Sequence, residues 1–403
     1  MFKSPAAQKI IEKANRFGAR NYAPKEVVID HAKGCVAYDV DGKPYFDMLS
    51  AYSALNFGHC HPELVKTAQA QLGKLTLTSR AFHNPLLGDF YEALCGLTGK
   101  DMVLPMNTGA EAVETALKTA RRWGASAKGI KNGEQEIVVC DGNFHGRTIS
   151  IVSFSADEDA RGGYGPYTPG FRIIPYGDAQ ALEDAVNKNT AAFLVEPIQG
   201  EAGVIVPPNG YLSAVRDICT RHNILMIADE VQTGFARTGN MFACGHENVE
   251  PDIYILGKAL GGGIMPVSAI AANSDILGVF TPGSHGSTFG GNPLACAVAI
   301  KAMEILVRDG YAQMAREKGA YFAKRLNAIK NGDIVEIRGR GLLIGMELSR
   351  SASGYVKSLI ENGILAKETH ERTIRFAPPI VISYAELDEA CDRIEAAFTG
   401  VRL

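Results

Sequence analysis

Residues 224–234, with the sequence ILMIADEVQTG, decide the fold. Five apolar residues are followed at once by Asp229, and Gln232 comes three positions later. A short run that is apolar on both faces is typical of a strand in a mostly parallel sheet that helices cover on both sides. Ligands bind beyond the carboxyl ends of such strands, so the polar residues after this run indicate a candidate site.

Similar short runs occur on both sides of this stretch and alternate with segments of helical length. They are EIVVC at 136–140, AFLVE at 192–196 and DIYIL at 252–256. This alternation predicts an α/β fold, in which a large domain holds a mostly parallel central sheet.

The two ends of the chain differ from this middle part. The first fifty residues include a predicted antiparallel ribbon. Toward the carboxyl end, we expect a helical region at 293–330, strands within 336–348 and 373–380, and a helix from Tyr384. We therefore predict a large domain at residues 51–292 and a smaller α+β domain at 293–403, which the N-terminal segment 1–50 joins.

Composition excludes several classes of protein. The 403 residues include 41 Lys and Arg against 44 Asp and Glu, so the net charge of −3 provides no basic field for nucleic acid or an anionic membrane. No stretch reaches the ~18 apolar residues of a membrane span, and charges near the amino terminus are unlike a signal peptide. The eight cysteines are scattered without a Cys-x-x-Cys pair, so we expect a reducing cytoplasm.

Lys258 follows the run DIYIL and precedes a glycine-rich turn in the segment LGKALGGG. Burial lowers the pKa of a lysine, and a neutral amine can form a Schiff base with an aldehyde. The alternative is a lysine at the end of a strand that extends to solvent. The segment is not a phosphate-binding Walker A loop, because the order Gly-x-x-x-x-Gly-Lys-Ser/Thr is absent.

Asp229 stands at the end of a buried run, where a carboxylate is costly unless it meets a cation. A protonated pyridine nitrogen is such a cation, and a carboxylate beside it keeps pyridoxal phosphate an effective electron sink. Gln232 can then donate to the phenolic oxygen of that cofactor. Helix capping or a structural salt bridge are the alternatives for Asp229.

A predicted phosphate site lies at the start of the helix that follows Asn107 and Thr108. Thr108 and Glu111 form a capping box, and Gly109 and Ala110 offer backbone N–H groups at the positive end of the helix dipole. Because Gly109 has no side chain, a phosphate can approach closely. A capping box with only a structural role is the alternative.

The loop DGNFHGRT at 141–148 follows another predicted strand and contains Phe144 between two glycines, Gly142 and Gly146. Phe144 can stack on an aromatic ring, and Arg147 can bind a carboxylate through paired hydrogen bonds. His145 fits a packing or hydrogen-bonding role better than that of a base.

The run AFLVE ends in Glu196, and a second carboxylate, Glu201, comes five residues later. We infer that Glu201 pairs with Arg375 on a strand of the smaller domain. The segment His59-Cys60-His61 lacks further ligands at metal-binding spacing, so we predict a turn before Pro62 and no metal site.

Seven motifs in this order resemble the class III, or subgroup II, pyridoxal-phosphate aminotransferases over essentially the whole chain. They are GHCHP (58–62), NTGAEAVETA (107–116), FHGRT (144–148), EPIQGEAG (196–203), ADEVQTGFARTG (228–239), LGKALGGG (256–263) and GSTFGGNP (286–293). The resemblance implies a fold type I transferase with pyridoxal 5'-phosphate as cofactor.

The resemblance also implies a role for each site residue. Lys258 would be the Schiff-base lysine and proton shuttle, with Asp229 on the pyridine nitrogen, Gln232 on the phenolic oxygen and Phe144 against the ring. Gly109 and Ala110 would bind the phosphate. Thr288 would reach the cofactor phosphate of a neighbouring subunit, so the expected assembly is a homodimer or a dimer of dimers.

Segment 49–56, LSAYSALN, is similar to the substrate-tyrosine segment of the members of this family that use ornithine. By this resemblance, Tyr22 and Arg147 would hold the α-carboxylate of ornithine, with Tyr52 favouring that orientation. The implied reaction converts ornithine and 2-oxoglutarate to glutamate-5-semialdehyde and glutamate, and Glu201 would cover Arg375 during the ornithine half.

Three alternatives stay open at this point. The chain could act on acetylornithine, 4-aminobutyrate or another ω-amino acid. It could use the same cofactor for an aminomutase or decarboxylase reaction. It could also be a binding protein without catalytic activity.

Overall fold

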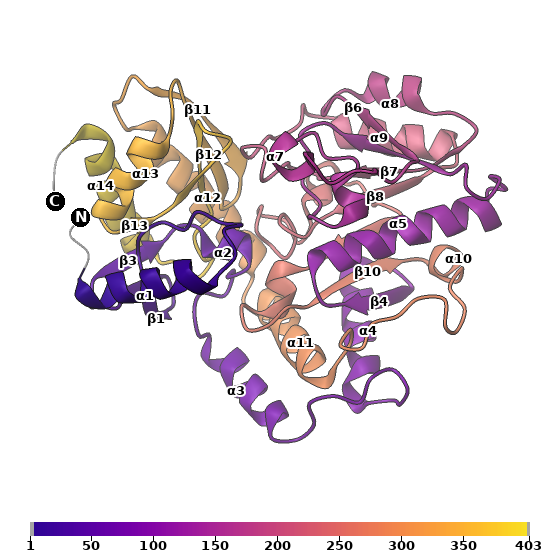
Figure 1. Ribbon diagram of the computed structural model, residues 1–403, viewed down its shortest axis with the longest axis horizontal. Coiled ribbons are helices and arrows are strands. Elements are labelled where there is room, and N and C mark those ends of the chain that lie inside the picture. The colour runs from indigo at the N-terminus through magenta and orange to yellow at the C-terminus, as the bar shows by residue number, and fades with distance from the viewer. Residues whose placement is uncertain (1–3, 401–403) are drawn as a thin grey trace.

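The computed structural model describes residues 4–400 and is organised around a seven-stranded sheet (Figure 1). The strand order is β4-β10-β9-β8-β7-β5-β6. β10 runs antiparallel to both of its neighbours, and the other neighbouring pairs are parallel. The strands span Met102–Met106 (β4), Glu136–Cys140 (β5), Phe171–Ile174 (β6), Thr190–Val195 (β7), Leu225–Asp229 (β8), Ile253–Leu256 (β9) and Ser268–Ala272 (β10).

The predicted α/β fold with a mostly parallel sheet is confirmed. The four predicted runs are strands β5, β7, β8 and β9, and their observed bounds differ from the predicted ones by at most two residues. The sequence did not predict β4, β6 or β10. β10 consists mainly of small residues because α5 packs against it, β4 contains Pro105, and β6 is a half-exposed edge strand.

Helices cover both faces of this sheet. α5 (Gly109–Ser126) packs its stripe of Val113, Ala116, Leu117 and Ala120 on one face. α8 (Ala179–Ala185) and α9 (Tyr211–Arg221) cover the other. The other short helices in this part are α6 (Ile149–Val152), α7 (Glu158–Arg161), α10 (Ser274–Leu277) and the 3-10 turns η1 (Ala243–Glu247) and η2 (Lys258–Gly261).

Elements from both ends of the chain form two smaller sheets and their helices, at the left of Figure 1. The predicted N-terminal ribbon is β1 (Ile29–Lys33), β2 (Val36–Asp39) and β3 (Pro44–Asp47), and β13 (Ile364–Leu365) pairs parallel with β3. A second sheet has the order β11-β12-β15-β14. Its strands span Ile334–Arg340 (β11), Leu343–Leu348 (β12), Lys367–Thr369 (β14) and Thr373–Phe376 (β15). The domain boundaries at residues 50 and 292 stay predictions.

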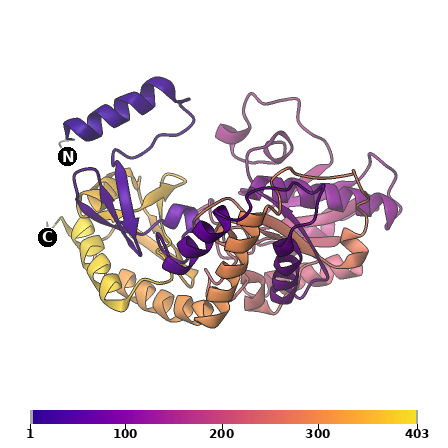
Figure 2. The ribbon, with the colours of Figure 1, turned by 90° about the horizontal axis from the view of Figure 1, so that it is seen from below.

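The helical region predicted at 293–330 is two helices, α11 (Pro293–Arg308) and α12 (Tyr311–Asn327), because Gly310 adopts a φ of 68° between them. The predicted closing helix is α14 (Tyr384–Thr399), which Ser383 and Glu386 cap. The other helices outside the central sheet are α3 (Pro62–Leu72), α4 (Pro85–Thr98) and α13 (Ser353–Glu361). α1 (Pro5–Phe17) stands apart from the body in Figure 2, and only Ala7 of it is buried.

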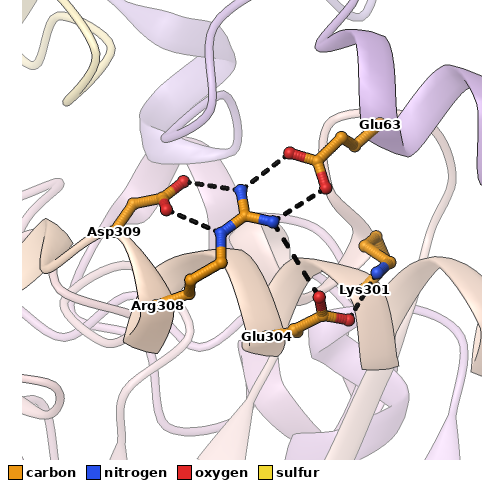
Figure 3. Close-up of polar contacts among 5 residues, drawn as sticks. All are labelled: Glu63, Lys301, Glu304, Arg308 and Asp309. Atoms are coloured by element: carbon orange, nitrogen blue, oxygen red, sulfur yellow. Dashed lines mark hydrogen bonds and ion pairs between the residues drawn. The ribbon is translucent and has the colours of Figure 1, made fainter.

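Arg308 at the end of α11 fixes the position of α3. Its guanidinium donates to both carboxylate oxygens of Glu63, at 2.9 and 2.7 Å, and to Asp309, while Glu304 lies 3.9 Å away (Figure 3). Lys301 pairs with Glu304 on the same helix. The network holds α3, and with it the turn that leads to the candidate site, against α11.

Arg237 joins the large sheet to both terminal segments. Its side chain is fully buried, and it donates from Nε to Asn56 at 3.1 Å and from Nη1 to the carbonyl oxygens of Leu342 and Pro378 at 3.1 and 2.6 Å. Burial lowers the pKa of Arg237 to about 9. Among residues 4–400, no helix has both the length and the apolar character that a membrane span needs.

Candidate active site

Lys258 lies at the carboxyl end of β9, where η2 begins. Its backbone adopts a φ of 45°, in the left-handed region that L-residues seldom occupy, so the surrounding fold imposes this conformation. Its side chain borders a cavity of about 500 Å³ that Asn107, Thr108 and Gly109 also line. Burial lowers the pKa of Lys258 to about 8, and the nearby Arg375 contributes in the same direction. A larger share of the amine is therefore neutral near pH 7 than for an exposed lysine.

Asp229 ends β8, the neighbour of β9, and it is almost completely buried. Its Oδ2 lies 2.7 Å from Nδ1 of His145, and its Oδ1 accepts from the backbone N–H of Val231 at 3.1 Å. Burial lowers the pKa of His145, but the hydrogen bond and charge of Asp229 outweigh it and raise that pKa overall. Nε2 of His145 has no hydrogen-bond partner within the described residues.

Glu196 follows β7 and forms the third buried ionisable group beneath the site. Its carboxylate accepts from the backbone N–H groups of Phe144, at 2.9 Å, and Gly200, at 3.4 Å. Burial raises the pKa of Glu196 to about 7, and Asp229 adds to this increase. Glu196 was not predicted as a site residue, since only its place directly after a buried strand distinguishes it in the sequence.

The raised pKa values of Glu196 and His145 predict a pH dependence of stability. Both groups bind protons more tightly in the folded than in the unfolded protein, so their contribution is present below the unfolded pKa and is lost as pH rises. For Glu196 the window runs from about 4.5 to about 7. In the cofactor-free wild-type protein, Glu196 should make the unfolding free energy fall as pH rises through this window. Glu196→Gln should make that fall smaller by about 2–3 kcal/mol. Urea unfolding at a series of pH values measures this change.

Glu134 provides the control, because it is exposed and pairs with Lys131. Glu134→Gln should leave the slope of unfolding free energy against pH between 4.5 and 7 nearly as it is in the wild-type protein. An unchanged slope in Glu196→Gln would contradict the raised pKa.

The start of α5 faces the same cavity as Lys258. Thr108 caps the helix by accepting from Glu111 N–H at 3.2 Å, and the Glu111 carboxylate accepts from Thr108 N–H at 2.8 Å. The first N–H groups of the helix have no partner inside the helix. A side chain at Gly109 would come within 3.2 Å of Val231, so glycine leaves room for the segment after β8, and Thr108 and Gly109 both line the cavity. Thr288 is exposed on the loop beside Ser287, which accepts a hydrogen bond from Asn107 at 2.9 Å.

Glu201 and Arg375 form the ion pair inferred from the sequence, with 2.7 Å between Nη1 and Oε1. Gln232 is part of the same cluster: it accepts from Arg375 at 3.0 Å and donates to Glu201 at 3.2 Å. Burial opposes ionisation of Glu201, but Arg375 and Lys258 outweigh it and hold the pKa of this carboxyl below its usual range. The bridge by Gln232 was not anticipated, and its contact with the phenolic oxygen of a cofactor stays a prediction.

Arg147, Tyr22 and Tyr52 take part in contacts between cations and aromatic rings near the site. The Arg147 guanidinium lies 5.9 Å from the ring centre of Tyr22 and 5.8 Å from that of Phe144. Tyr52 lies deeper, and its ring centre is 5.1 Å from the guanidinium of Arg375. The structure thus brings Arg147, Tyr22 and Phe144 into one group and Tyr52 into the Glu201–Arg375 group.

These residues fit a cofactor that combines an aldehyde, a pyridine nitrogen and a phosphate. One cavity is lined by a lysine of lowered pKa and by Thr108 and Gly109 at the start of α5, and a buried carboxylate ends the strand next to that lysine. No group of three or more His, Cys, Asp or Glu within residues 4–400 is arranged to hold a metal ion, and His59 instead lies 2.8 Å from Asp47.

Comparisons with known proteins agree with this geometry. The aminotransferase class-III family matches residues 17–398. An ornithine aminotransferase of Brevibacillus brevis is 58% identical and one of Bacillus subtilis is 54% identical, and each alignment covers 96% of this chain and 97% of the relative.

Two solved structures show the same fold over almost the entire chain. The ornithine aminotransferase of Toxoplasma gondii superposes with a TM-score of 0.97 at 43% identity, covering 99% of this chain and 96% of the other. The acetylornithine aminotransferase of Elizabethkingia anophelis gives a TM-score of 0.90 at 46% identity, covering 98% and 99%. The chain therefore belongs to the class III aminotransferases, which are pyridoxal-phosphate-dependent enzymes.

Proposed function

We propose that the protein is an ornithine δ-aminotransferase. It transfers the δ-amino group of L-ornithine to 2-oxoglutarate in two successive half-reactions, and it releases glutamate-5-semialdehyde and L-glutamate. The observation that carries this proposal is the arrangement of Tyr52, Arg375 and Glu201. Glu201 neutralises the guanidinium of Arg375, which an α-carboxylate would otherwise bind. The similarity to ornithine aminotransferases at 54–58% identity supports the same substrate.

Bound pyridoxal phosphate supplies an aldehyde that takes up the amino group and a ring that spreads the negative charge of the deprotonated carbon. Lys258 would hold the cofactor through its amine and would also move a proton to and from the substrate carbon. Its lowered pKa suits both tasks, since the neutral amine is the form that accepts the proton.

The remaining site residues would orient the cofactor and balance its charges. Asp229, which His145 orients at 2.7 Å, places a buried negative charge for the pyridine nitrogen. Phe144 would pack against the ring of the cofactor, while Gly109 and Ala110 would donate backbone N–H groups to its phosphate. In a homodimer or a dimer of dimers, Thr288 on its exposed loop would reach the phosphate of the neighbouring subunit.

Substrate orientation follows from charge. Tyr22 and Arg147 bind the α-carboxylate of ornithine at the entrance, so the δ-amino end points to Lys258. Glu201 neutralises Arg375 in this half-reaction. In the second half-reaction Glu201 turns away, and Arg375 binds a carboxylate of 2-oxoglutarate.

Ornithine-dependent formation of the semialdehyde tests the function. The purified enzyme is supplied with 2-oxoglutarate and with ornithine, N-acetylornithine or 4-aminobutyrate, and initial rates are compared. Ornithine should give the highest kcat/KM. A clear preference for N-acetylornithine, the substrate named for the structural relative from Elizabethkingia anophelis, would favour that second candidate.

Removal of Glu201 should change which amino group is transferred. Without the carboxylate, Arg375 is available to an α-carboxylate in both half-reactions, so Glu201→Ala should raise α-amino transfer relative to δ-amino transfer by about tenfold or more. Product analysis with ornithine and with glutamate as amino donors measures the ratio. Glu336→Ala, which removes an exposed glutamate paired with Arg338, is the control. An unchanged ratio in Glu201→Ala would refute the covering role.

We further propose that the enzyme works in the cytoplasm as at least a dimer. Large apolar side chains stay exposed on the single chain, among them Phe82 at 73% and Phe289 at 56%, and Phe289 directly follows Thr288. Exposed apolar groups next to a residue expected to serve a neighbouring site support contact with a second copy.

A further inference from the structure

Tyr52 is presented on a segment with an unusual backbone. Ser50, Ala51, Tyr52 and Ser53 all have positive φ, at 50°, 47°, 61° and 72°, so they form a left-handed turn of four L-residues. Such a conformation is unfavourable for each residue. The hydroxyls of Ser50 and Ser53 are also buried without a partner within the described chain. The surrounding structure must therefore hold this turn in place.

Asp47 supports the start of the turn. Its Oδ1 accepts from the backbone N–H groups of Leu49 and Ser50 at 3.0 and 2.8 Å, and its Oδ2 lies 2.8 Å from His59. These contacts fix the backbone but leave the Tyr52 ring free to rotate about its side-chain bonds.

Lys367 holds the ring itself. Its Nζ donates to the hydroxyl oxygen of Tyr52 at 3.1 Å and lies 5.5 Å from the ring centre. Arg375 lies 5.1 Å from the same ring centre. Tyr52 is thus within reach of two cations, both of which attract the negative face of an aromatic ring.

The two cations stand opposite each other on neighbouring antiparallel strands, since Lys367 of β14 is the register partner of Arg375 of β15. Like charges at directly opposite positions are destabilising. Arg375 is neutralised by Glu201, but no carboxylate of residues 4–400 forms an ion pair with Lys367. Glu368, the next residue, pairs with Lys25 instead. Among residues 4–400, Lys367 therefore places beside Tyr52 a positive charge without an ion-pair partner, and only the field of the adjacent Glu368, whose pKa it helps to lower, partly offsets that charge.

This charge faces space that a ligand can enter. A cavity of about 300 Å³ is lined by Tyr22, Tyr52 and Lys367, together with Leu49 and Lys25. Because Lys367 occupies a lone pair of the Tyr52 oxygen, the phenolic proton is left to be donated to another group. A hydroxyl donor beside a positive charge fits a carboxylate and not an ammonium group.

We propose that Lys367 is a specificity-determining positioning residue, which orients Tyr52 so that the Tyr52 hydroxyl donates to the carboxylate of the amine substrate. For ornithine this is the α-carboxylate, shared with Tyr22. The inference rests on the proposed function for the identity of the substrate, but the recognised group is a carboxylate in any case.

Three amines of similar length test the proposal in the first half-reaction of the holoenzyme. Ornithine carries both a carboxylate and an α-ammonium, 5-aminopentanoate carries only the carboxylate, and 1,4-diaminobutane carries no carboxylate. Rapid mixing follows the absorption of the bound cofactor at increasing amine concentration. The initial slope and the limiting rate then separate binding from chemistry.

Lys367→Met should lower the initial slope for ornithine and 5-aminopentanoate by about tenfold, through weaker binding, and should change that for 1,4-diaminobutane by less than about twofold. Lys367→Arg, which keeps a donor and a charge, should restore most of the loss. In a double-mutant cycle, Lys367→Met should have little further effect once Tyr52→Phe has removed the hydroxyl. Lys131→Met, at an exposed lysine paired with Glu134, is the matched control.

Two results would overturn the proposal. An equal loss for all three amines would show that Lys367 only supports the fold, and a gain for ornithine over 5-aminopentanoate would show that it repels the α-ammonium. If the wild-type enzyme rejects ornithine but accepts 4-aminobutyrate, the proposed function fails independently. The comparison is then made between 4-aminobutyrate and 1-aminobutane, and a loss confined to 4-aminobutyrate would still support the role of Lys367.

Discussion

Lys258→Ala is expected to lower turnover by at least about 10⁴-fold, the upper range for removal of a positioned acid or base. Lys258 is asked to do two things, to hold the cofactor and to move a proton, and no other lysine lines its cavity within the described residues. A second effect should accompany the loss: the visible absorption of the cofactor-bound protein should change, because the bond to the lysine cannot form.

A small added amine separates this role from a loss of structure. Methylamine or ethylamine can enter the space of the missing side chain and accept the proton, so it should restore part of the activity in proportion to its concentration. Circular dichroism and the unfolding temperature should stay close to the wild type. Full activity in Lys258→Ala, or an unchanged absorption band, would refute the assignment.

Asp229→Asn is expected to lower turnover by about 10²–10³-fold, or roughly 3–4 kcal/mol, which lies within the range typical for removal of one partner of a buried ion pair. Asparagine keeps the size of the side chain but removes the charge that would stabilise a protonated pyridine nitrogen. The hydrogen bond to His145 should also weaken, since it loses its charged partner. Steady-state rates and titration of the cofactor-free protein with pyridoxal phosphate measure both effects.

Asp252→Asn is the matched control for this substitution. Asp252 precedes β9 at the other end of the sheet, where it pairs with Arg216 at 2.7 Å and accepts from the backbone N–H of Met226. Its loss should affect stability but leave cofactor affinity and turnover nearly unchanged. Equal catalytic losses in the two variants would mean that Asp229 acts through the fold and not at the site.

The sequence predicted the strands that carry the site because their apolar runs are bounded by polar residues with chemical roles. β5, β7, β8 and β9 belong to this group. β10 escaped prediction because its small residues reflect close packing by α5, which a local pattern does not contain. Boundaries between consecutive elements were harder, as the division of 293–330 at Gly310 shows.

The same distinction applies to the site. The Glu201–Arg375 pair was inferred because Glu201 is a carboxylate in the loop that follows an apolar strand and Arg375 is an isolated cation within another strand. Other contacts of the site join residues that are distant in the chain, so no pattern of spacing predicts them. They are the hydrogen bonds of Glu196 with Phe144, of Gln232 with Arg375 and of Lys367 with Tyr52. The left-handed turn at 50–53 lacks glycine, the residue that usually signals such a conformation.

The parallel pairing of β3 with β13 has a consequence for the order of folding. The backbone N–H groups of Phe46 and Met48 donate to the carbonyl oxygens of Gly363 and Leu365, so the N-terminal ribbon lacks its last strand until the ribosome has made more than three hundred further residues. The central sheet can form in that interval, because its strands lie between residues 102 and 272. Contacts this distant in sequence form slowly. We therefore expect newly made chains to acquire their substrate tyrosine last, after the lysine and aspartate of the central sheet are already in place.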